Sequence, residues 1–404
     1  MGNLLYLVHR LPYPPNKGDK VRSYHLLKHL QQRHRVFLGT FIDDPDDEQH
    51  LATLGRLCPD LHVARINPLW AKVRSLTGLL RREALTLGYY RDAGLQQWVH
   101  DMAQAHHFDA VVVFSSAMAP FAPRGLTTLV DFVDVDSAKW TQYAAARPWP
   151  LSWLYRREGE RLLAFERAVA ATARRSFFVT QNEVDLFKSR APECAFGVEA
   201  LSNGVDSDFF APDATRPNPF QAGETALVFT GAMDYWPNVD GVSWFVKNML
   251  PQLLQQWPAL RFYIVGRSPS PQVQALASDR VVVTGTVADV RPYLQHAAAV
   301  VAPLRVARGI QNKILEAMAM ARAVVTVPSC ADAIESAGPM QGIVRASEPA
   351  EFVEALGKLL LYPAQADVLG QAARQCVIDH YSWQAHLSGI DPYLEPTATF
   401  REKK

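Results

Sequence analysis

The sequence predicts an α/β protein built from two doubly wound, Rossmann-like domains. Short apolar runs alternate with helical patterns from the first residues, and this alternation is typical of a parallel sheet covered by helices on both faces. The alternation stops once, at Asn203-Gly204 and a tract rich in Pro and Asp over residues 206–220, and then starts again. A chain of 404 residues, 49% of them hydrophobic, is long enough to form two such domains.

The first half of the chain contains six apolar runs that we interpret as strands. They cover residues 4–8, 35–40, 61–66, 109–114, 128–133 and 176–180. Helical patterns separate them, and the longest covers residues 151–173. We therefore expect a first domain over residues 1–205.

The second half repeats this organisation. Predicted strands cover residues 226–230, 262–265, 281–284, 299–302 and 323–327. A helix over residues 242–250 is expected to end or kink at Pro251, because proline cannot continue the backbone hydrogen bonds. This predicts a second domain over residues 206–380, followed by a terminal helix from Trp383 and a polar tail within 381–404.

Composition excludes several classes of protein. A net charge of +1 argues against a dedicated nucleic-acid binder, which carries a basic excess. The four cysteines have no metal-ligand spacing and favour a reducing compartment. No apolar run reaches the ~18 residues of a spanning helix, and the apolar start is too short for a signal peptide. There is no dinucleotide Gly-x-Gly-x-x-Gly, Gly-x-Ser-x-Gly or P-loop motif. These observations predict a cytoplasmic protein.

One segment is strongly basic. Between residues 61 and 91 there are six Lys or Arg and one acid, Glu83. Apolar residues are interleaved with them, so the segment is compatible with a basic amphipathic helix on an anionic membrane, at the inner face of the plasma membrane. A surface helix with a solvated basic face is the alternative. The residues concerned are Arg65, Lys72, Arg74, Arg81, Arg82 and Arg91, with Leu69, Trp70, Val73, Leu76, Leu79 and Leu80.

Residues 305–327 carry the clearest functional pattern. They read as a loop, a helix and a short β-branched strand, with Gly309 at the helix start. Glycine lets the backbone approach a ligand, and the free N–H groups of a first helical turn favour an anion, so we predict a phosphate site here. Lys313 and Glu316 lie one turn apart on one face. A surface Lys–Glu pair on an ordinary amphipathic helix is the alternative.

A family resemblance strengthens the functional interpretation. Gly309-Ile-Gln-Asn-Lys-Ile-Leu-Glu-Ala-Met-Ala319 and the Ala-Val-Val-Thr-Val after it resemble the donor-site helix of the retaining glycosyltransferases of family 4, which have the two-domain GT-B fold. The resemblance implies that Glu316 binds the ribose hydroxyls of a donor nucleotide. The family's first Glu falls on Arg308. Either Arg308 meets a phosphate or an acidic sugar, or the amides of Gly309 and Ile310 hold the sugar. The resemblance also implies a C-terminal helix that crosses back to the first domain.

Three further segments resemble this family. Asn16-Lys-Gly-Asp19 resembles its first glycine loop, so Lys17 and Gly18 are candidates for contact with the donor phosphates or the acceptor; a plain turn is the alternative. Leu201-Ser-Asn-Gly-Val-Asp206 is similar to its interdomain signature, with Ser202 in place of proline. Val265-Gly-Arg267 resembles its Val-Gly-x segment and adds Gly266 and Arg267 as candidates.

Part of the family's diphosphate-binding motif is missing from this sequence. Gly231 is present, but the Arg that often follows the glycine is absent. We therefore expect one of four cations to compensate: Lys313, Arg305, Arg308 or Arg267.

Asp134-Val-Asp136 follows a predicted strand of the first domain. Three interpretations are open: a metal-binding Asp-x-Asp, helix N-caps, or carboxylates that bind or deprotonate an acceptor hydroxyl. The nucleotide signals lie in the other half of the chain, which argues against the metal site, and we expect no metal. In the family that the chain resembles, many members place a His or Asp beside the acceptor after this strand, so the resemblance implies the acceptor role for Asp134 and Asp136.

The overall pattern is similar to the sugar transferases of bacterial exopolysaccharide clusters. The resemblance implies retaining transfer of a sugar from a nucleotide-diphosphate donor to a lipid-linked or glycan acceptor, without a cofactor. Lys313 and the amides of Gly309 and Gly18 would stabilise the leaving diphosphate. The alternatives are a nucleotide-sugar epimerase on the same fold and a non-catalytic sugar-nucleotide-binding subunit.

Overall fold

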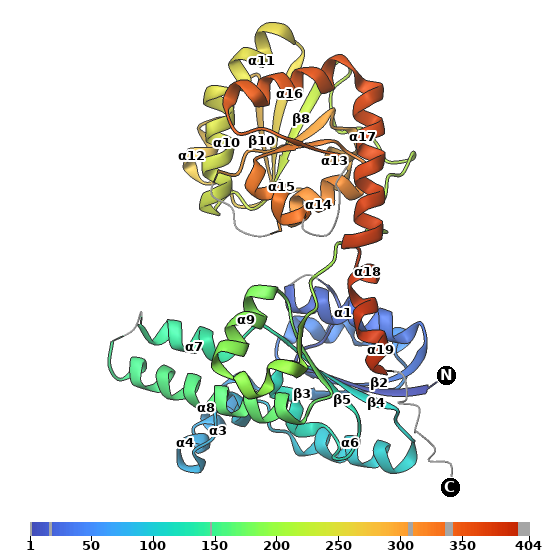
Figure 1. Cartoon of the computed structure of the whole chain (residues 1–404), viewed down its shortest axis with the longest axis vertical. Coiled ribbons are helices and arrows are strands. Elements are labelled where there is room, and N and C mark those ends of the chain that lie inside the picture. Colours follow the sequence, from blue (N-terminus) through green and yellow to red (C-terminus); the bar gives the residue numbers. More distant parts are fainter. Residues whose placement is uncertain (1, 16–17, 146–147, 306–309, 336–341, 395–404) are drawn as a thin grey trace. The chain divides into compact units, whose positions relative to one another are not determined.

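The computed structural model describes residues 2–15, 18–145, 148–305, 310–335 and 342–394. It divides into two compact units. Unit 1 comprises Met1–Asn203 with Leu387–Lys404, and unit 2 comprises Gly204–His386. Each unit has a parallel sheet with helices on both faces (Figure 1), so the predicted fold class is confirmed.

Unit 1 contains a seven-stranded parallel sheet of order β3-β2-β1-β4-β5-β6-β7. The six predicted strands are all present, with ends shifted by a few residues at most. The last strand, β7, was not predicted, because three residues are too few to show a pattern. The strands are β1 (Gly2–Val8), β2 (His34–Ile42), β3 (Leu61–Arg65), β4 (Ala110–Phe114), β5 (Thr128–Val133), β6 (Arg175–Phe178) and β7 (Val198–Ala200).

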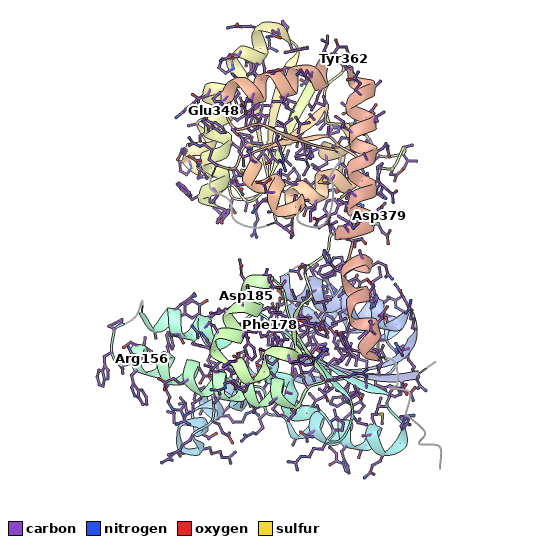
Figure 2. All side chains as sticks on the ribbon, viewed as in Figure 1. Arg156, Phe178, Asp185, Glu348, Tyr362 and Asp379 are labelled. Carbon is purple, nitrogen blue, oxygen red and sulfur yellow. The ribbon has the colours of Figure 1, made fainter. Side chains whose placement is uncertain are left out.

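Helices connect these strands. Strand residues such as Phe178 are fully buried, since helices cover both sides of the sheet (Figure 2). The helices are α1 (Gly18–Gln31), α2 (Leu51–Leu57), α3 (Pro68–Ser75), α4 (Thr77–Arg81), α5 (Leu85–Tyr89), α6 (Ala93–Ala105), α7 (Asp136–Ala145), α8 (Leu151–Thr172) and α9 (Gln181–Arg190), with 3₁₀ turns at Pro45–His50, Ser116–Phe121 and Pro192–Gly197.

The basic segment over residues 61–91 does not form one amphipathic helix, so the prediction of a single helix was wrong. It folds as β3 and then α3, α4 and α5. Arg82 ends α4 in the left-handed conformation. A Cβ at Gly88 would lie 2.9 Å from the Cα of Ser75, so α5 packs directly on α3. Close packing between short helices therefore overrides the continuous helical pattern.

Unit 2 contains a six-stranded parallel sheet of order β10-β9-β8-β11-β12-β13. The five predicted strands are present, and the three-residue β13 was missed. The strands are β8 (Thr225–Thr230), β9 (Leu260–Val265), β10 (Val281–Gly285), β11 (Ala299–Ala302), β12 (Val324–Thr326) and β13 (Ile343–Arg345).

The helices of unit 2 confirm the predicted break at Pro251, which lies in the first turn of a new helix. They are α10 (Trp236–Asn248), α11 (Leu250–Gln256), α12 (Pro271–Gln274), α13 (Arg291–His296), α14 (Asn312–Ala319), α15 (Pro328–Glu335), α16 (Pro349–Leu361) and α17 (Pro363–Cys376). Among the described residues, none of the chain's helices has the length and apolar character needed to span a membrane.

The C-terminal segment returns to unit 1, as the resemblance implied. It is not one helix but four short turns: a π turn (Val377–Tyr381), α18 (Trp383–Leu387), a 3₁₀ turn (Ser388–Ile390) and α19 (Asp391–Leu394). Asp391 lies 2.7 Å from the Nε2 atom of His29 and accepts a hydrogen bond from Arg33. The hydroxyl of Tyr393 donates to Glu199 at 2.7 Å. These contacts hold α19 on unit 1.

Candidate functional site

Two glycines stand at the C-terminal ends of neighbouring strands in unit 2. Gly231 follows β8 and Gly266 follows β9, and the N–H of Gly231 donates to the carbonyl of Val265 at 3.0 Å. A Cβ on Gly266 would lie 1.7 Å from the carbonyl oxygen of Gly231, so a side chain does not fit there. The two strand ends therefore present backbone with no side chain, which lets a ligand approach closely.

Lys313 points to this backbone from α14. Its ammonium donates to the Oδ1 atom of Asn238 and lies 4.7 Å from the centre of the Phe229 ring. A Cβ added to Gly231 would lie only 3.1 Å from the same ammonium. The structure thus brings Gly231, Gly266 and Lys313 together. Burial lowers the pKa of Lys313 to about 8, and the nearby Glu316 carboxylate opposes that shift.

Glu316 lies on the next turn of α14. Burial raises its pKa to about 6, and the charge of Lys313 acts in the opposite direction. Within the described part of the chain, its carboxylate accepts no hydrogen bond. A half-buried carboxylate without a hydrogen-bond donor can accept hydrogen bonds from a ligand. Perturbed pKa values of this kind concentrate at functional sites.

The N-terminus of α14 lies beside these groups. The helix begins at Asn312, three residues after Gly309, and the preceding Gln311 forms no side-chain cap. Ile310 directly before it is 38% exposed. Arg308 and Gly309 lie outside the described residues, so their predicted roles stay predictions. The helix start provides free N–H groups and a positive dipole end, which favour an anion.

Three of the four cations expected to compensate for the missing arginine lie in the described residues and can be compared. Arg305 is already engaged, because it donates to Asp240 at 2.7 Å and lies 4.9 Å from the ring of Trp244. Arg267 is exposed, and its guanidinium has no partner among the residues that the structure describes. Lys313 and Arg267 are therefore the described cations that remain available to a diphosphate.

In unit 1, the two predicted carboxylates lie together at the end of β5. Lys139 Nζ donates to Asp134 at 2.7 Å and to Asp136 at 3.0 Å. Burial disfavours the charged form of Lys139, but Asp136 and Asp134 outweigh it and raise its pKa. Asp136 is the first residue of α7, which also fits the helix-terminus alternative. In the described ranges, no cluster of three or more His, Cys, Asp or Glu residues could hold a metal ion.

The first glycine loop lies partly outside the described residues. Lys17 is among the undescribed residues, and Gly18 is the first residue of α1. The Asp19 carboxylate next to it lies 3.6 Å from His9 Nε2 and accepts a hydrogen bond from Arg10 at 3.1 Å. His9 and then Arg10 hold the pKa of Asp19 well below its usual range, although burial acts against them.

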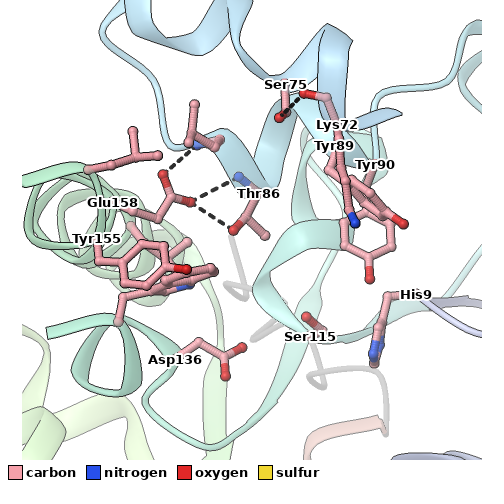
Figure 3. Close-up of a pocket in the computed structure, with 14 residues that line it drawn as sticks. His9, Lys72, Ser75, Thr86, Tyr89, Tyr90, Ser115, Asp136, Tyr155 and Glu158 are labelled. Atoms are coloured by element: carbon pink, nitrogen blue, oxygen red, sulfur yellow. Dashed lines mark hydrogen bonds between the residues drawn. The ribbon is translucent and has the colours of Figure 1, made fainter. Parts of the chain in front are cut away.

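Unit 1 also contains a pocket of about 430 Å³ that we did not predict (Figure 3). Ser115, which lines the pocket, has a positive φ of 73°. Such strain concentrates at functional sites. The lining residues are His9, Lys72, Ser75, Leu85, Thr86, Tyr89, Tyr90, Ser115, Asp136, Trp140, Leu154, Tyr155, Glu158 and Leu162.

The pocket brings Asp136 together with residues that carried no sequence motif. His9 follows β1, and its ring stacks on Phe114 at 5.8 Å. The sequence also contains the spacing of Leu154, Glu158 and Leu162, which fall on one face of a helix. That spacing predicts a buried face but does not reveal a cavity. Asn238, the partner of Lys313, was also missed.

Comparisons with known proteins agree with this geometry. Residues 224–361 match the family model described as glycosyl transferases group 1, a range that includes Gly231, Gly266, Lys313 and Glu316. No curated protein matches the chain.

Solved structures match over nearly the whole chain. Sucrose-phosphate synthase from Thermosynechococcus elongatus has a TM-score of 0.56 and 16% identity, covering 97% of this chain and 98% of its own. HepE from Anabaena, solved with UDP and glucose, has a TM-score of 0.57 and 13% identity, covering 98% and 99%. WaaG, a glycosyltransferase involved in lipopolysaccharide biosynthesis, has a TM-score of 0.52 and 17% identity, covering 96% and 99%. The two-domain GT-B fold is thus established, and the family match supports glycosyl transfer.

Proposed function

We propose that the protein is a retaining glycosyltransferase. It moves a sugar from a nucleotide-diphosphate donor to a lipid-linked or glycan acceptor, in exopolysaccharide biosynthesis. One observation carries the proposal: side-chain-free strand ends at Gly231 and Gly266 face the half-buried Lys313, with Glu316 one turn further along the helix. UDP and UDP-glucose are bound by HepE, which has a similar fold.

Unit 2 would bind the donor. As the bond between the anomeric carbon and the phosphate oxygen breaks, negative charge develops on the departing diphosphate. Lys313, Arg267 and the first amides of α14 stabilise that charge where it forms. The Glu316 carboxylate accepts hydrogen bonds from the ribose hydroxyls. Gly231 and Gly266 let the phosphates approach the backbone.

Unit 1 would bind the acceptor. Asp134 and Asp136 hold the acceptor hydroxyl, and the hydrogen bonds from Lys139 orient both carboxylates. The acceptor oxygen attacks the anomeric carbon from the face that the diphosphate leaves, and the hydroxyl proton passes to the departing phosphate oxygen. The new glycosidic bond therefore retains the anomeric configuration, and no cofactor or metal takes part. Lys17, Gly18, Arg308, Gly309 and Ile310 keep their proposed donor contacts.

Residues 69–91 would contact the membrane at its cytoplasmic face. Leu69 and Trp70 on α3 are 75% and 73% exposed. Arg81 and Arg82 have no acidic partner among the described residues. An apolar surface beside unpaired cations suits an anionic bilayer. Changing Arg81 and Arg82 to Glu should reduce binding to anionic vesicles, and wild-type binding should fall with added salt. Unchanged binding would exclude this contact.

Two measurements test the proposed activity. A thermal-shift panel of UDP, GDP, ADP and dTDP should identify one base, since a ligand at about 100 times its dissociation constant stabilises a protein by roughly 2.7 kcal/mol. Product analysis by NMR with that donor should then show a glycoside of the donor's own anomeric configuration. An isomerised sugar nucleotide without any acceptor would indicate an epimerase, and binding without turnover would indicate a sugar-nucleotide-binding subunit.

A further inference from the structure

The pocket of unit 1 lies between two pairs of helices. Lys72, Tyr89 and Tyr90 line one side from α3 and the end of α5, while Tyr155 and Glu158 line the other from α8 (Figure 3). Asp136, Ser115 and His9 lie along a third side, at the ends of strands (Figure 3). The pocket is therefore closed by the sheet at its base and bounded by helices at its sides.

Hydrogen bonds fix the two pairs of helices to each other. The carboxylate of Glu158, a residue only 1% exposed, accepts from the N–H groups of Leu85 and Thr86 at 2.6 and 2.9 Å. Arg157 donates to the carbonyls of Glu83 and Gly78 at 3.1 and 2.8 Å. The walls are thus held by buried polar contacts, so the pocket is a built feature of unit 1.

Each wall also exposes large apolar side chains on its outer side. On the first wall these are Leu69, Trp70 and Val73 of α3 and Leu80 of α4. On the second wall, Trp149 before α8 and Trp153 within it are 80% and 55% exposed. Figure 2 labels Arg156 on this outer part of α8, where α7 and α8 project from the unit. Tryptophan beside arginine is typical of the membrane–water interface.

The interior of the pocket suits a sugar. Hydroxyls of Tyr89, Tyr90 and Tyr155 accompany aromatic faces, and the rings of Trp140 and Tyr155 lie 5.1 Å apart. The ammonium of Lys72 has no partner among the described residues, so it is available to an anionic group of the ligand. A volume of about 430 Å³ lies in the range of small-molecule sites. Aromatic faces with polar tips can stack on a sugar ring and hydrogen-bond its hydroxyls.

We infer that this pocket takes the sugar head group of a glycolipid, and that the exposed apolar side chains of both walls lie in the membrane that holds its lipid chain. The inference rests on the proposed function and narrows its acceptor to a glycolipid. It also proposes that the α7–α8 hairpin contacts the membrane in addition to residues 69–91. The amphipathic pattern supports this: Leu154 and Glu158 line the pocket, whereas Trp153 of the same helix is exposed.

The pocket is tested with octyl glucoside below its micellar concentration. Saturable binding, followed by saturation-transfer NMR on the full-length protein, is expected for octyl glucoside, and weaker binding for glucose or for an octyl detergent without a sugar. Tyr155→Ala should weaken binding about tenfold, as expected when one buried aromatic contact is lost. Tyr235→Ala, at an exposed tyrosine of unit 2, is the matched control. Equal binding of the sugar-free detergent, or no effect of Tyr155→Ala in a folded protein, would overturn the inference.

The second membrane element is tested with vesicles of phosphatidylcholine and phosphatidylglycerol. Trp149→Ser with Trp153→Ser should reduce flotation with these vesicles by about tenfold or more. Leu361→Ser with Tyr362→Ser, at exposed apolar residues of unit 2, should change nothing. An equal loss in both variants, or no loss in the first, would contradict a membrane contact through the α7–α8 hairpin.

The stabilisation by nucleotide separates this inference from the proposed function. The Trp149 and Trp153 variant and the Tyr155 variant should keep the wild-type thermal shift with the preferred nucleoside diphosphate. A protein that binds octyl glucoside in the pocket but no nucleotide would refute the donor site alone. A protein that binds the nucleotide but neither octyl glucoside nor vesicles would refute the glycolipid acceptor alone.

Discussion

The two units have the same scaffold but different strand ends. In each sheet the first strand, β1 or β8, lies inside the sheet. The next two strands in sequence lie on one side of it, and the remaining strands lie on the other side. In unit 2 the strands β8 and β9 are followed directly by Gly231 and Gly266, whose backbones are in contact. In unit 1 the corresponding first strand ends before His9, and a pocket of about 430 Å³ forms above the sheet. The same topology therefore gives a backbone surface suited to phosphate in one unit and a side-chain-lined pocket in the other.

The charged groups differ in the same way. Lys139 of unit 1 forms ion pairs with both Asp134 and Asp136 at partly exposed positions. Lys313 and Glu316 of unit 2 are withdrawn from water, and their pKa values are shifted toward the neutral forms. Because burial disfavours the charged forms of Lys313 and Glu316, a bound ligand of suitable charge can stabilise those charged forms. Both units therefore contain acidic and basic side chains. The proposed donor site differs because the carboxylate of Glu316 accepts no hydrogen bond within the described residues, whereas both carboxylates of unit 1 accept one from Lys139.

The largest effect is expected from Gly266→Ala. The added Cβ would meet the carbonyl oxygen of Gly231 at 1.7 Å, so two strand ends must separate. We expect a loss of about 3 kcal/mol in the free energy of unfolding, the upper end for overpacking, and loss of nucleotide binding. Urea denaturation and thermal shift measure both. Gly197→Ala, which meets no atom within 4 Å, is the control. A Gly266→Ala protein that is stable and still binds the nucleotide would contradict the inference that Gly231 and Gly266 leave no room for a side chain.

A smaller effect is expected in unit 1 from Glu158→Ala. This change leaves the N–H groups of Leu85 and Thr86 without their acceptor. The expected cost is about 2 kcal/mol, as for buried donors left unsatisfied, with weaker octyl glucoside binding and an unchanged nucleotide shift. Urea denaturation measures the stability. Glu160→Ala, at an exposed position of the same helix, should cost almost nothing. If nucleotide binding fell as well, the two sites would not be independent.

Lys313 is expected to affect binding more than folding. Lys313→Met should weaken nucleoside diphosphate binding about tenfold or more, because a charge-assisted hydrogen bond is lost. The exposed Lys247→Met on α10 is the control. Calorimetric titration measures both. Equal affinities for the wild type and Lys313→Met would place the diphosphate elsewhere.

The pH dependence of binding sharpens this test. Burial lowers the pKa of Lys313 to about 8, so its positive charge is lost as pH rises through that value. A terminal phosphate with a pKa of ~6 stays ionised over the same range. Affinity in the wild type should therefore fall between neutral and alkaline pH. Lys313→Arg should remove that fall, since arginine stays charged. A wild-type affinity that is constant across pH 8 would contradict the assignment.

The smallest effect on stability is expected from Asp136→Asn. The carboxylate is partly exposed and Lys139 retains Asp134, so the loss should stay below about 1 kcal/mol. Turnover, in contrast, should fall if this carboxylate holds the acceptor hydroxyl. Chemical denaturation and a donor-release assay measure the two quantities. Wild-type turnover in a folded Asp136→Asn protein would remove it from the site.

The sequence was sufficient for the elements with strong periodicity. Eleven strands were predicted from apolar runs, whereas β7 and β13, with three residues each, were too short to show a pattern. The basic segment near Trp70 was mistaken for one helix because its pattern is continuous, while the packing of Gly88 on Ser75 is a tertiary feature. Local patterns thus predict elements but not the contacts that interrupt them.

The candidate site was predictable only in part. Gly231, Gly266 and Lys313 were identified from their place after strands or at a helix start, and the structure brings them together. Their partner Asn238 and the pocket beside Glu158 were missed, because both depend on residues brought together from distant parts of the chain. The predicted contacts of Lys17, Arg308 and Gly309 fall outside the described residues. The lining of the pocket comes from residues between His9 and Leu162, so no single segment of the sequence could have revealed it.

The most direct test of the account is a calorimetric comparison of two ligands on two proteins. The ligands are the nucleoside diphosphate that stabilises the protein most and its 2′-deoxy analogue, and the proteins are the wild type and Glu316→Gln. The account predicts that the wild type prefers the ribose form, and that Glu316→Gln weakens binding of this form and removes most of the preference. Equal binding of the ribose form by both proteins would contradict the assignment of Glu316 to the ribose, and with it the proposed donor site.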